Sequence, residues 1–281
     1  MLVSATDAVG PEYQHIYLSP HFDDVVYSCG GTIALQALQR ERSLVVTVFA
    51  GLPGPDLKLS SFARRIQRTM SSSREAFSLV ELRRQEDQQA CSSLQADCLW
   101  LDYLDAIYRG SPALYRWKRA IGGRVRQVDA WIVEDLLRLC LALHRRLPSL
   151  HWYAPLGIGG HVDHRVVAAA AFRLLVYGAN VAFYEDFPYV LRPSALRKRL
   201  QELGVTMQPQ LVEISDTLTL RQQAAGLYAS QVRINFGSPA ALYQSIEGYS
   251  SQISPKRGAH MERFWRVALQ TADCRPPCLP D

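Results

Sequence analysis

Short apolar runs rich in β-branched residues alternate along this chain with longer segments of helical periodicity, and this alternation restricts the fold more than any other feature. Strands that alternate with helices are typical of βα units, which build a parallel sheet with helices packed on its faces. The sequence therefore predicts an α/β fold with a mostly parallel sheet. The predicted strands are residues 15–19, 43–51, 98–105, 150–157, 180–189 and 210–214.

The segments between these strands place an apolar residue at every third or fourth position, which predicts helices. These helices span roughly residues 30–40, 77–94, 128–147 and 161–177. In the second helix, the apolar positions expected to face the sheet are Phe77, Val80, Leu82 and Leu94. Residues 52–73 are rich in Gly, Pro and Ser, and we expect a mobile loop there, beside the functional site.

The composition is that of an ordinary globular protein. Of the 281 residues, 48% are hydrophobic and 20% are charged, which predicts one domain over residues 1–281 with an irregular tail from about residue 270. The net charge is +5. We interpret the Lys and Arg residues as scattered among acidic ones, which favours solubility, gives only weak attraction to acidic partners and predicts no nucleic-acid partner.

Neither a membrane span nor a secretion signal is visible. No apolar stretch reaches the length of about 18 residues that a spanning helix requires. The first residues, "MLVSATDAVGPEYQ", lack the basic and apolar blocks of a signal peptide. We therefore expect a cytoplasmic protein.

The six cysteines contain no CxxC pair. Cys29, Cys91, Cys98 and Cys140 lie inside apolar periodic segments, so we expect buried thiols rather than a redox or zinc cluster. The other two lie in the tail "CRPPCLPD". Cys274 and Cys278 could bind a metal or form a bridge there, although a Pro-rich terminus is more often simply irregular.

A dinucleotide site is the first function to test in such a fold, because ligands bind where parallel strands end. The "CGG" after the first strand is not GxGxxG. The second strand ends in Ala50 and Gly51, where a ribose-binding site would have an acidic residue. The sequence argues against a nucleotide cofactor.

Two clusters of polar residues follow the first and fourth strands. Alone, the first cluster suits a capped turn as well as a site, since an aspartate after a strand often caps the next helix, whereas the second cluster alone favours metal binding. Together they place several metal-binding side chains at strand exits on one edge of a parallel sheet, which is hard to explain structurally. The clusters are His21, Asp23 and Asp24 in "SPHFDD", and His161, Asp163 and His164 in "GGHVDH".

The number of groups in the two clusters suits metal-assisted hydrolysis. A catalytic zinc takes about three protein ligands and keeps one position open for water, whose pKa it lowers. Two histidines and one aspartate would satisfy it. The remaining aspartate could accept a proton from that water, and the remaining histidine could stabilise an oxyanion or protonate a leaving amine. The sequence therefore predicts an amide hydrolase.

The same residues resemble the motifs of a known family. "SPHFDD" is similar to the AHPDDE motif, and "GGHVDH" to the HPDH motif, of the PIG-L or LmbE-like deacetylases, zinc-dependent enzymes that remove N-acetyl groups from amino sugars. "RRQED", "YEDFPY" and "LYASQ" follow as further family features in the same order. The resemblance implies a single-domain, Rossmann-like three-layer fold.

The resemblance also implies roles for the residues of the two clusters. Asp23 would be the general base, and His161 would be the electrophilic or acid histidine, oriented by Asp163. One zinc ion would be bound by His21, Asp24 and His164.

The family pattern extends to the substrate. By this likeness Arg83 and Asp105 would hold sugar hydroxyls, and the structural alternative is a surface ion pair between them. Glu185 and Asp186 follow the fifth strand, and we expect one of them to support the site or accept a hydroxyl. The chain departs from the pattern at Phe22, where proline is usual, and at Val25, where glutamate is usual. Phe22 could stack on a sugar or pack in the core, and packing is favoured.

Three other functions stay open at this stage. Within the same chemistry, the runner-up to removal of an N-acyl group from an amino sugar is an amidase that acts on a larger amide conjugate. A non-catalytic carbohydrate-binding protein is disfavoured because a binder needs neither a base nor an acid. A metallophosphatase is disfavoured because such sites usually need more carboxylates and often two metals. The sugar, the acyl group and the oligomeric state are not determined by the sequence.

Overall fold

A seven-stranded sheet runs through the computed structural model, which describes residues 1–70 and 76–268. The strand order is β3-β2-β1-β4-β5-β7-β6. The first five strands of this order are parallel, and β7 and β6 are antiparallel to their neighbours. The strands are β1 (Tyr13–Ser19), β2 (Arg42–Thr47), β3 (Asp97–Trp100), β4 (His151–Pro155), β5 (Asn180–Tyr184), β6 (Met207–Glu213) and β7 (Met261–Val267).

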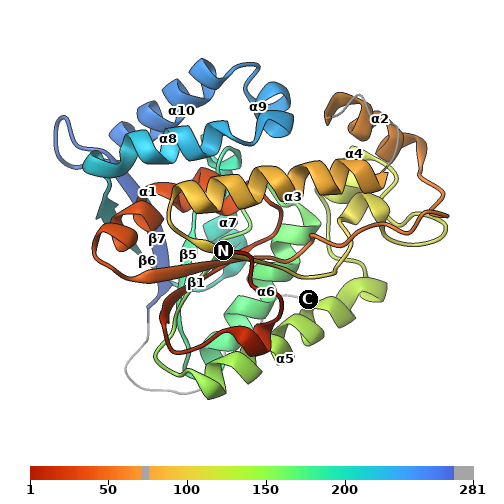
Figure 1. Cartoon of the computed structure of the whole chain (residues 1–281), viewed down its shortest axis with the longest axis horizontal. Helices are drawn as coiled ribbons and strands as arrows, with labels where there is room; N and C mark the ends of the chain where they lie inside the picture. The colour runs from red at the N-terminus through yellow and green to blue at the C-terminus, as the bar shows by residue number, and fades with distance from the viewer. Residues whose placement is uncertain (71–75, 269–281) are drawn as a thin grey trace.

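Helices cover both faces of this sheet, which confirms the expected three-layer α/β fold (Figure 1). On one face lie α1 (Asp24–Leu38), α3 (Ala76–Ser93) and α8 (Leu218–Gly226), with α9 (Ala229–Asn235) and α10 (Pro239–Gln252) beside α8. On the other face lie α5 (Ala130–Arg146) and α6 (Val162–Val176). The shorter helices are α2 (Ser61–Met70), α4 (Lys118–Ile121) and α7 (Ala195–Leu203).

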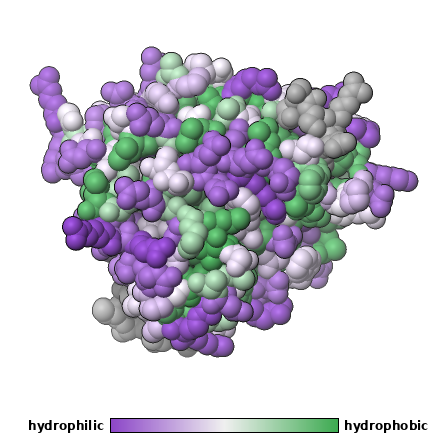
Figure 2. Space-filling model, viewed as in Figure 1, coloured by the Kyte–Doolittle hydropathy of each residue, from purple (hydrophilic) through white to green (hydrophobic). Residues whose placement is uncertain are grey.

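The surface in this view is mainly hydrophilic, with small hydrophobic areas between polar side chains (Figure 2). Within residues 1–70 and 76–268, no helix has both the length and the apolar character that crossing a bilayer demands. The four cysteines expected to be buried thiols are buried and unbridged. The tail from about residue 270, with Cys274 and Cys278, lies outside the described residues.

The structure corrects several expectations about individual elements. The first helix begins at Asp24 rather than near Gly30, so one residue of the first polar cluster opens the helix and another, Asp23, is its N-cap residue. The segment 52–73 is not only a loop, because α2 occupies residues 61–70; residues 71–73 lie outside the described residues. Strand β7 was not predicted: its sequence, "MERFWRV", mixes charged and aromatic residues at the antiparallel end of the sheet.

The face that α3 turns to the sheet also differs from the prediction. Val80 and Leu94 are buried, but Phe77 is 50% exposed and Leu82 38% exposed. Polar residues take the inward positions instead. Asp87 is fully buried and accepts hydrogen bonds from Tyr228 Oη (2.8 Å) and Trp100 Nε1 (2.7 Å). Hydropathy misassigns this face because buried polar residues with hydrogen-bond partners replace apolar ones.

Contact between α3 and α9 explains two of the sequence features noted above. The "RRQED" segment of α3 and the "LYASQ" segment meet through three hydrogen bonds. Besides the bond from Tyr228 to Asp87, Glu86 accepts from the backbone N–H of Ser230 (2.8 Å) and from its hydroxyl (2.6 Å). In this chain the two motifs therefore connect α3 to the start of α9 within one helix layer.

The strand order places the two polar clusters side by side. From β1 the chain proceeds outward to β2 and β3, and then returns to β4 on the other side of β1. The connections from β1 and β4 lead to opposite sides of the sheet, and in open sheets of this kind the ligand crevice lies at that point, between the carboxyl ends of the two strands. Residues 21–24 follow β1, and residues 161–164 follow β4. The topology therefore brings both clusters to the same crevice.

The glycine pair in "CGG" lets other elements approach α1 closely. A Cβ atom on Gly31 would lie 2.9 Å from Cβ of Ile214 and 2.9 Å from Oε1 of Glu262. Glu262 of β7 accepts the backbone N–H groups of Gly31 (2.9 Å) and Thr32 (2.8 Å). Arg221 of α8 pairs with Glu262 (3.2 Å) and donates to the carbonyl of Tyr27. The two glycines of "CGG" therefore serve the packing of α1 against its neighbours and not phosphate binding.

We expect Gly31→Ala to destabilise the protein by about 1–3 kcal/mol, because the added methyl group overpacks a buried contact. The matched control is Gly248→Ala in α10, where a Cβ atom would meet nothing within 4 Å. That change should be neutral or stabilise by up to about 1 kcal/mol, since alanine is the better helix former. Urea unfolding followed by circular dichroism measures both. Equal stabilities of the two variants would contradict the packing argument.

Candidate metal centre and active site

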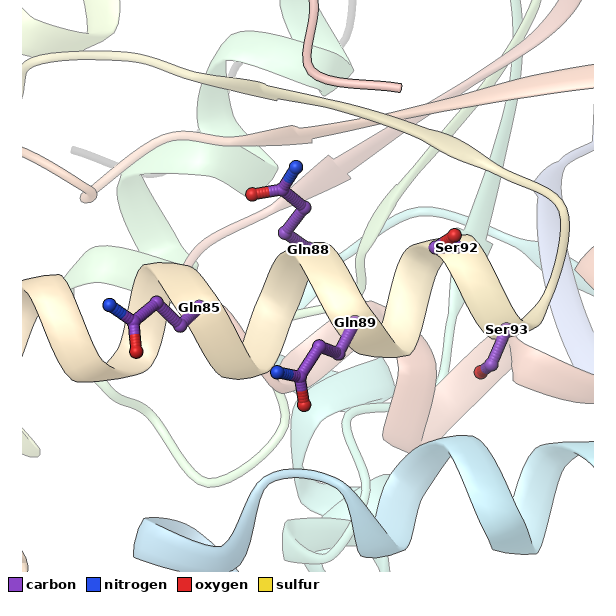
Figure 3. A pocket seen from close by; sticks show the side chains of 5 residues that line it. All are labelled: Gln85, Gln88, Gln89, Ser92 and Ser93. Carbon is purple, nitrogen blue, oxygen red and sulfur yellow. The ribbon is translucent and has the colours of Figure 1, made fainter.

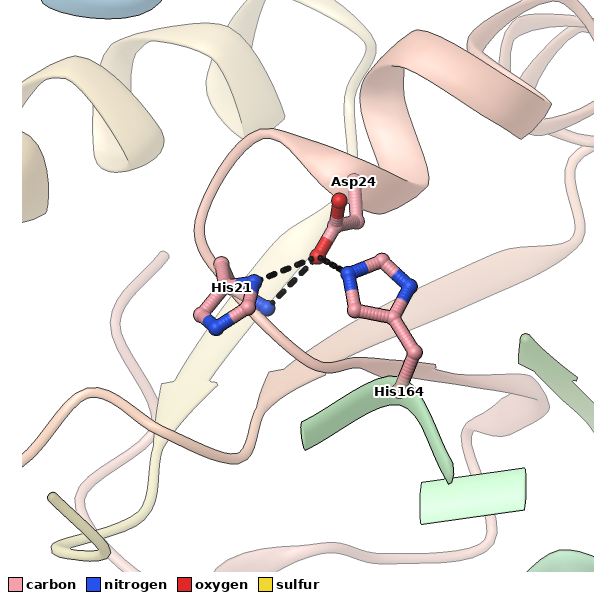
Figure 4. Close-up of side chains that lie close together, drawn as sticks. All are labelled: His21, Asp24 and His164. Atoms are coloured by element: carbon pink, nitrogen blue, oxygen red, sulfur yellow. Dashed lines mark hydrogen bonds and ion pairs between the residues drawn. The ribbon is translucent and has the colours of Figure 1, made fainter. Parts of the chain in front are cut away.

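Three side chains from the two clusters converge in the crevice between β1 and β4 (Figure 4). Oδ2 of Asp24 lies 3.1 Å from Nδ1 of His21 and 3.2 Å from Nε2 of His164. One potential ligand atom from each residue lies within 4.8 Å of the other two, and all three residues are buried. The structure therefore brings together the three residues that the sequence assigned to a metal, and this group could hold one ion.

Hydrogen bonds on the far sides of the two rings fix their orientation. Nδ1 of His164 lies 2.6 Å from Oδ1 of Asp186, and the other oxygen of Asp186 accepts the backbone N–H groups of Gly157 and Ile158, both at 2.8 Å. Asp186 is therefore an acceptor, so His164 carries its proton on Nδ1 and leaves the Nε2 lone pair free. Nε2 of His21 likewise lies 3.0 Å from Oδ2 of Asp163.

Of the two acidic residues after β5, Asp186 is the one that contacts the site. Glu185 points elsewhere: its carboxylate accepts from Arg263 Nε (2.6 Å) and Trp265 Nε1 (2.8 Å) of β7. The sequence left this choice open. It depends on which way each side chain leaves the strand, because successive residues of a strand point to opposite faces.

The electrostatics of the group suit a cation. Among the described residues, buried Nε2 of His164 has no hydrogen-bond partner, although Asp24 is within ion-pair distance. Burial lowers the pKa of His164, but Asp24 and Asp186 outweigh burial and raise it to about 9. Burial opposes ionisation of Asp24, yet the two histidines hold its pKa well below the ordinary value. The Asp24 carboxylate and the two rings therefore favour a positive charge between them, and a metal ion that displaced the imidazole protons would meet two nitrogen ligands and one oxygen ligand, a donor set that fits zinc.

Asp23 lies next to this group and pairs with Arg83 of α3. Oδ1 of Asp23 is 2.9 Å from Nη2 of Arg83, and both side chains are buried. Burial raises the pKa of Asp23, and Arg83 opposes this rise. The Arg83 guanidinium also lies over the ring of Phe22, 5.0 Å from its centroid. Phe22 is buried, so it packs in the core and cannot stack on a sugar.

His161 caps the N-terminus of α6, and its contact with Asp163 differs from the expected one. Nδ1 of His161 accepts the backbone N–H of Asp163 (3.2 Å), whereas the Asp163 carboxylate is 4.0 Å away. The backbone of Asp163 therefore orients the His161 ring, and the carboxylate does not. Because Nδ1 is an acceptor, the proton of neutral His161 is on Nε2. Burial lowers the pKa of His161 to about 3.

The Asp163 carboxylate instead joins three parts of the crevice. Besides its contact with His21, it accepts the backbone N–H of Ala106 (3.0 Å) and pairs with Nη1 of Arg109 (2.6 Å). Arg109 is buried and also donates to Asp129 (2.8 Å). Sequence reasoning missed Arg109, because no motif surrounds it and its partners lie far away in the chain.

Asp105 and Arg83 lie at the same crevice but do not form the surface pair considered above. Oδ1 of Asp105 accepts the backbone N–H of Ile107 (3.1 Å), and Oδ2 lies 3.8 Å from Nε2 of His21. The ion pair of Arg83 is the buried one with Asp23. Asp105 thus lies near His21 and Arg83 contacts Asp23, and the role of both in binding sugar hydroxyls stays a prediction.

A depression of about 600 Å³ elsewhere on the molecule is unrelated to this centre (Figure 3). It lies along α3 and is lined by glutamine and serine side chains, none of which belongs to either polar cluster. The lining residues are Gln85, Gln88, Gln89, Ser92 and Ser93.

Comparisons with known proteins find similar sequences and similar solved structures. Residues 16–175 match the family described as PIG-L, GlcNAc-PI de-N-acetylase. A 2'-N-acetylparomamine deacetylase of Niallia circulans is 34% identical over 62% of this chain and 66% of its own length. The chain thus spans just under two thirds of that relative. A protein of the same name from Streptomyces fradiae is 27% identical over 90% of this chain and 89% of its own length.

A solved structure is also similar over nearly the whole chain. The zinc-inhibited form of teicoplanin deacetylase is 26% identical and superposes with a TM-score of 0.79, covering 92% of this chain and 99% of that one. That protein therefore has a similar overall fold.

We expect Asp186→Asn to weaken metal binding about tenfold to a hundredfold, because an amide cannot accept at both positions that the carboxylate now uses. The matched control is Glu185→Gln, one residue earlier, whose side chain contacts β7. Competition with a chromogenic chelator measures the affinity, and a thermal melt checks folding. Unchanged affinity of Asp186→Asn would show that Asp186 does not set the His164 orientation.

Proposed function

Because this chain belongs to the family of GlcNAc-PI de-N-acetylases, we propose that it hydrolyses an N-acyl group, acetyl in the simplest case, from an amino sugar that is part of a larger metabolite, and that it uses one zinc ion. The observation that carries this proposal is the convergence of His21, Asp24 and His164, with one ligand atom each within 4.8 Å of the others. The protein is a hydrolytic N-deacetylase, as its named relatives are.

One zinc ion would be held by His21 through Nδ1, by a carboxylate oxygen of Asp24 and by His164 through Nε2. A bound zinc ion polarises the acyl carbonyl and lowers the pKa of water. Support comes from the ring nitrogens themselves: the other nitrogen of each histidine is already engaged, by Asp163 and by Asp186. The ligand atoms are therefore oriented before any ion arrives.

Asp23 is the general base in this proposal. It lies beside Asp24, and its pairing with Arg83 leaves one oxygen, Oδ2, outside that ion pair. This oxygen takes a proton from the attacking water as the C–O bond forms. When the C–N bond breaks, the same carboxyl returns the proton to the departing amine. Water is consumed, and a carboxylic acid and a free amino sugar are produced.

His161 donates a hydrogen bond to the developing oxyanion. Its Nδ1 accepts from the backbone, so Nε2–H is the group that it can present to substrate. A histidine that stays neutral beside a cation is a hydrogen-bond donor more readily than a proton donor. Of the two roles that the sequence left open for His161, the electrophilic one is therefore preferred.

Arg83 and Asp105 bind the sugar. Arg83 uses one nitrogen for Asp23, and its fixed fork of donors suits sugar hydroxyls. Asp105 is partly exposed, with one oxygen 3.8 Å from His21, and can accept from a hydroxyl. The two relatives named as deacetylases of 2'-N-acetylparomamine, together with the teicoplanin deacetylase, support an amino sugar within a larger metabolite as the substrate class.

The proposed activity is tested by metal analysis of the purified protein together with acetate release from a panel of N-acetylglucosamine derivatives. We expect about one zinc per chain, loss of activity with a chelator, and recovery when zinc is returned. Acetate release that is unaffected by removal of the metal would contradict the proposal.

Single variants of Asp23 and Asp24 distinguish the role of a general base from that of a metal ligand. Asp23→Asn should keep zinc and reduce turnover about a hundredfold or more, because general-base catalysis typically contributes that much. Asp24→Asn should reduce zinc affinity itself. Metal content by atomic emission and turnover by acetate release distinguish them. The two assignments are reversed if Asp23→Asn loses the metal and Asp24→Asn retains it.

If the carboxylate of Asp105 binds a sugar hydroxyl, its replacement should weaken the binding of sugar substrates only. We expect Asp105→Asn to raise KM for an N-acetylated sugar about threefold to thirtyfold, the range for one hydrogen bond to a charged group. A simple acetamide without hydroxyls, if it is cleaved, serves as the control substrate and should be unaffected. Equal losses on both substrates would indicate damage to the site and not lost sugar contacts.

A further inference from the structure

A short segment next to the candidate site concentrates positive charge. Residues 116–126 read "RWKRAIGGRVR", and no acidic residue occurs from 106 to 128. All five cations of this segment are exposed: Arg116, Lys118, Arg119, Arg124 and Arg126. Their summed charge equals the net charge of +5 of the whole chain. The expectation that the cations are scattered is therefore wrong for this segment.

These five charges are not neutralised by neighbours. None of them has an ion pair within residues 1–70 and 76–268. Arg116 lies over the ring of Trp117, and Arg126 over that of Tyr115. Trp117 itself is 54% exposed. Asp102, an exposed acid at the start of the same connection, pairs with Arg84 at 3.7 Å instead.

The segment borders the crevice directly. The carbonyl oxygen of Gly122 lies 3.4 Å from the Cβ position of Gly160, which precedes His161 in the chain. Arg109, earlier in the same connection, holds Asp163. Tyr115, which directly precedes the segment, is linked to Arg109 because both donate to the carboxylate of Asp129, each at 2.8 Å.

Helix α2 adds further positive charge to this border. Its three exposed cations are Arg64, Arg65 and Arg68. Its buried Gln67 donates to Oη of Tyr108 (3.4 Å), in the same connection as the basic segment. Figure 1 shows α2 and α4 at the same end of the molecule. We name the eight exposed cations of α2 and residues 116–126 the basic rim.

We propose that the basic rim binds an anionic group, a phosphate or a carboxylate, on the part of the substrate that is attached to the amino sugar. This inference rests on the proposed function, because it concerns the same substrate. Like charges without counter-charges repel one another, and an anion placed among them relieves this repulsion and is steered to the crevice. A polycationic metabolite would be repelled. The preferred substrate therefore differs in charge from 2'-N-acetylparomamine, whose amines are protonated at neutral pH.

The experiment compares three soluble N-acetyl sugars of different charge on the zinc-loaded protein. They are N-acetylglucosamine 1-phosphate, the neutral methyl N-acetylglucosaminide and cationic 2'-N-acetylparomamine. Calorimetry measures binding, and acetate release is measured separately. We expect the phosphate to bind about tenfold more tightly than the neutral sugar at low salt, with the difference shrinking as ionic strength rises.

Two double variants that remove the same charge test the location of this preference. The double variant Lys118→Gln/Arg119→Gln changes the basic rim. The control Arg40→Gln/Arg145→Gln changes two exposed cations away from the crevice: Arg40 lies just before β2, and Arg145 lies in the last turn of α5, before β4. The rim variant should bind the phosphate about threefold to tenfold more weakly, the size expected for two lost exposed ion pairs. The control variant should not, and neither should alter binding of the neutral sugar.

Several results would overturn the proposal. One is equal binding of the three sugars; another is an equal loss in both double variants, which would assign the preference to net charge or to the zinc ion. A third is rim-dependent binding of vesicles containing phosphatidylserine without preference for the soluble phosphate, which would make the rim a membrane surface. Preferential, rim-dependent binding without acetate release from any sugar would support this inference and overturn the proposed function alone.

Discussion

The candidate site depends on the interactions of one group, the carboxylate of Asp163. It is fully buried, and an ionised carboxyl group inside a protein is costly unless charges and hydrogen bonds surround it. Its partners come from three segments: His21 after β1, the backbone of Ala106, and Arg109. Satisfying one buried charge therefore fixes the positions of the β1 exit, the start of α6 and the long connection after β3. The relative positions of these segments are fixed because each is bound to one of the two carboxylate oxygens of Asp163.

The same principle governs the helix layer that covers the other side of the crevice. Glu262 takes the backbone N–H groups of Gly31 and Thr32, and Arg221 pairs with Glu262 while it donates to the Tyr27 carbonyl. Asp87 is surrounded by the donors of Trp100 and Tyr228, and burial raises its pKa to about 6. Buried polar groups with specific partners define one arrangement more sharply than apolar contacts do. Helix α1, which presents Asp24, is held by such contacts.

The parts of this protein that the sequence predicted are those set by local patterns. Buried strands such as β2 leave a run of β-branched residues, and the polar residues at the ends of β1 and β4 stand out against such runs. The start of α1 was missed because its N-cap residue, Asp23, and its first residue, Asp24, are among those that signal a site. Strand β7 was missed because Glu262 and Arg263 interrupt its apolar pattern, and their partners belong to other elements.

Long-range partnerships account for the remaining differences. Arg109 has no local signature, since its role depends on Asp129 and Asp163 arriving from elsewhere in the chain. The choice between Glu185 and Asp186 depends on which face of the sheet each side chain meets. The sequence predicted that Asp163 orients His161, but sequence spacing does not tell whether the backbone N–H or the carboxylate makes the contact; in the structure it is the backbone N–H.

Chemistry and recognition therefore belong to different parts of the fold. The proposed metal ligands lie beyond the carboxyl ends of β1 and β4, His21 in the turn before α1, Asp24 at the start of α1 and His164 in the first turn of α6. The basic rim lies on α2 and on the connection between β3 and α5, which are exposed and can vary in sequence without disturbing the sheet. Arg109 joins the two, because it holds Asp163 inside the crevice and Asp129 beneath the basic segment. A change of substrate charge can thus be accommodated on the rim while the buried network around Asp163 keeps the reacting groups in place.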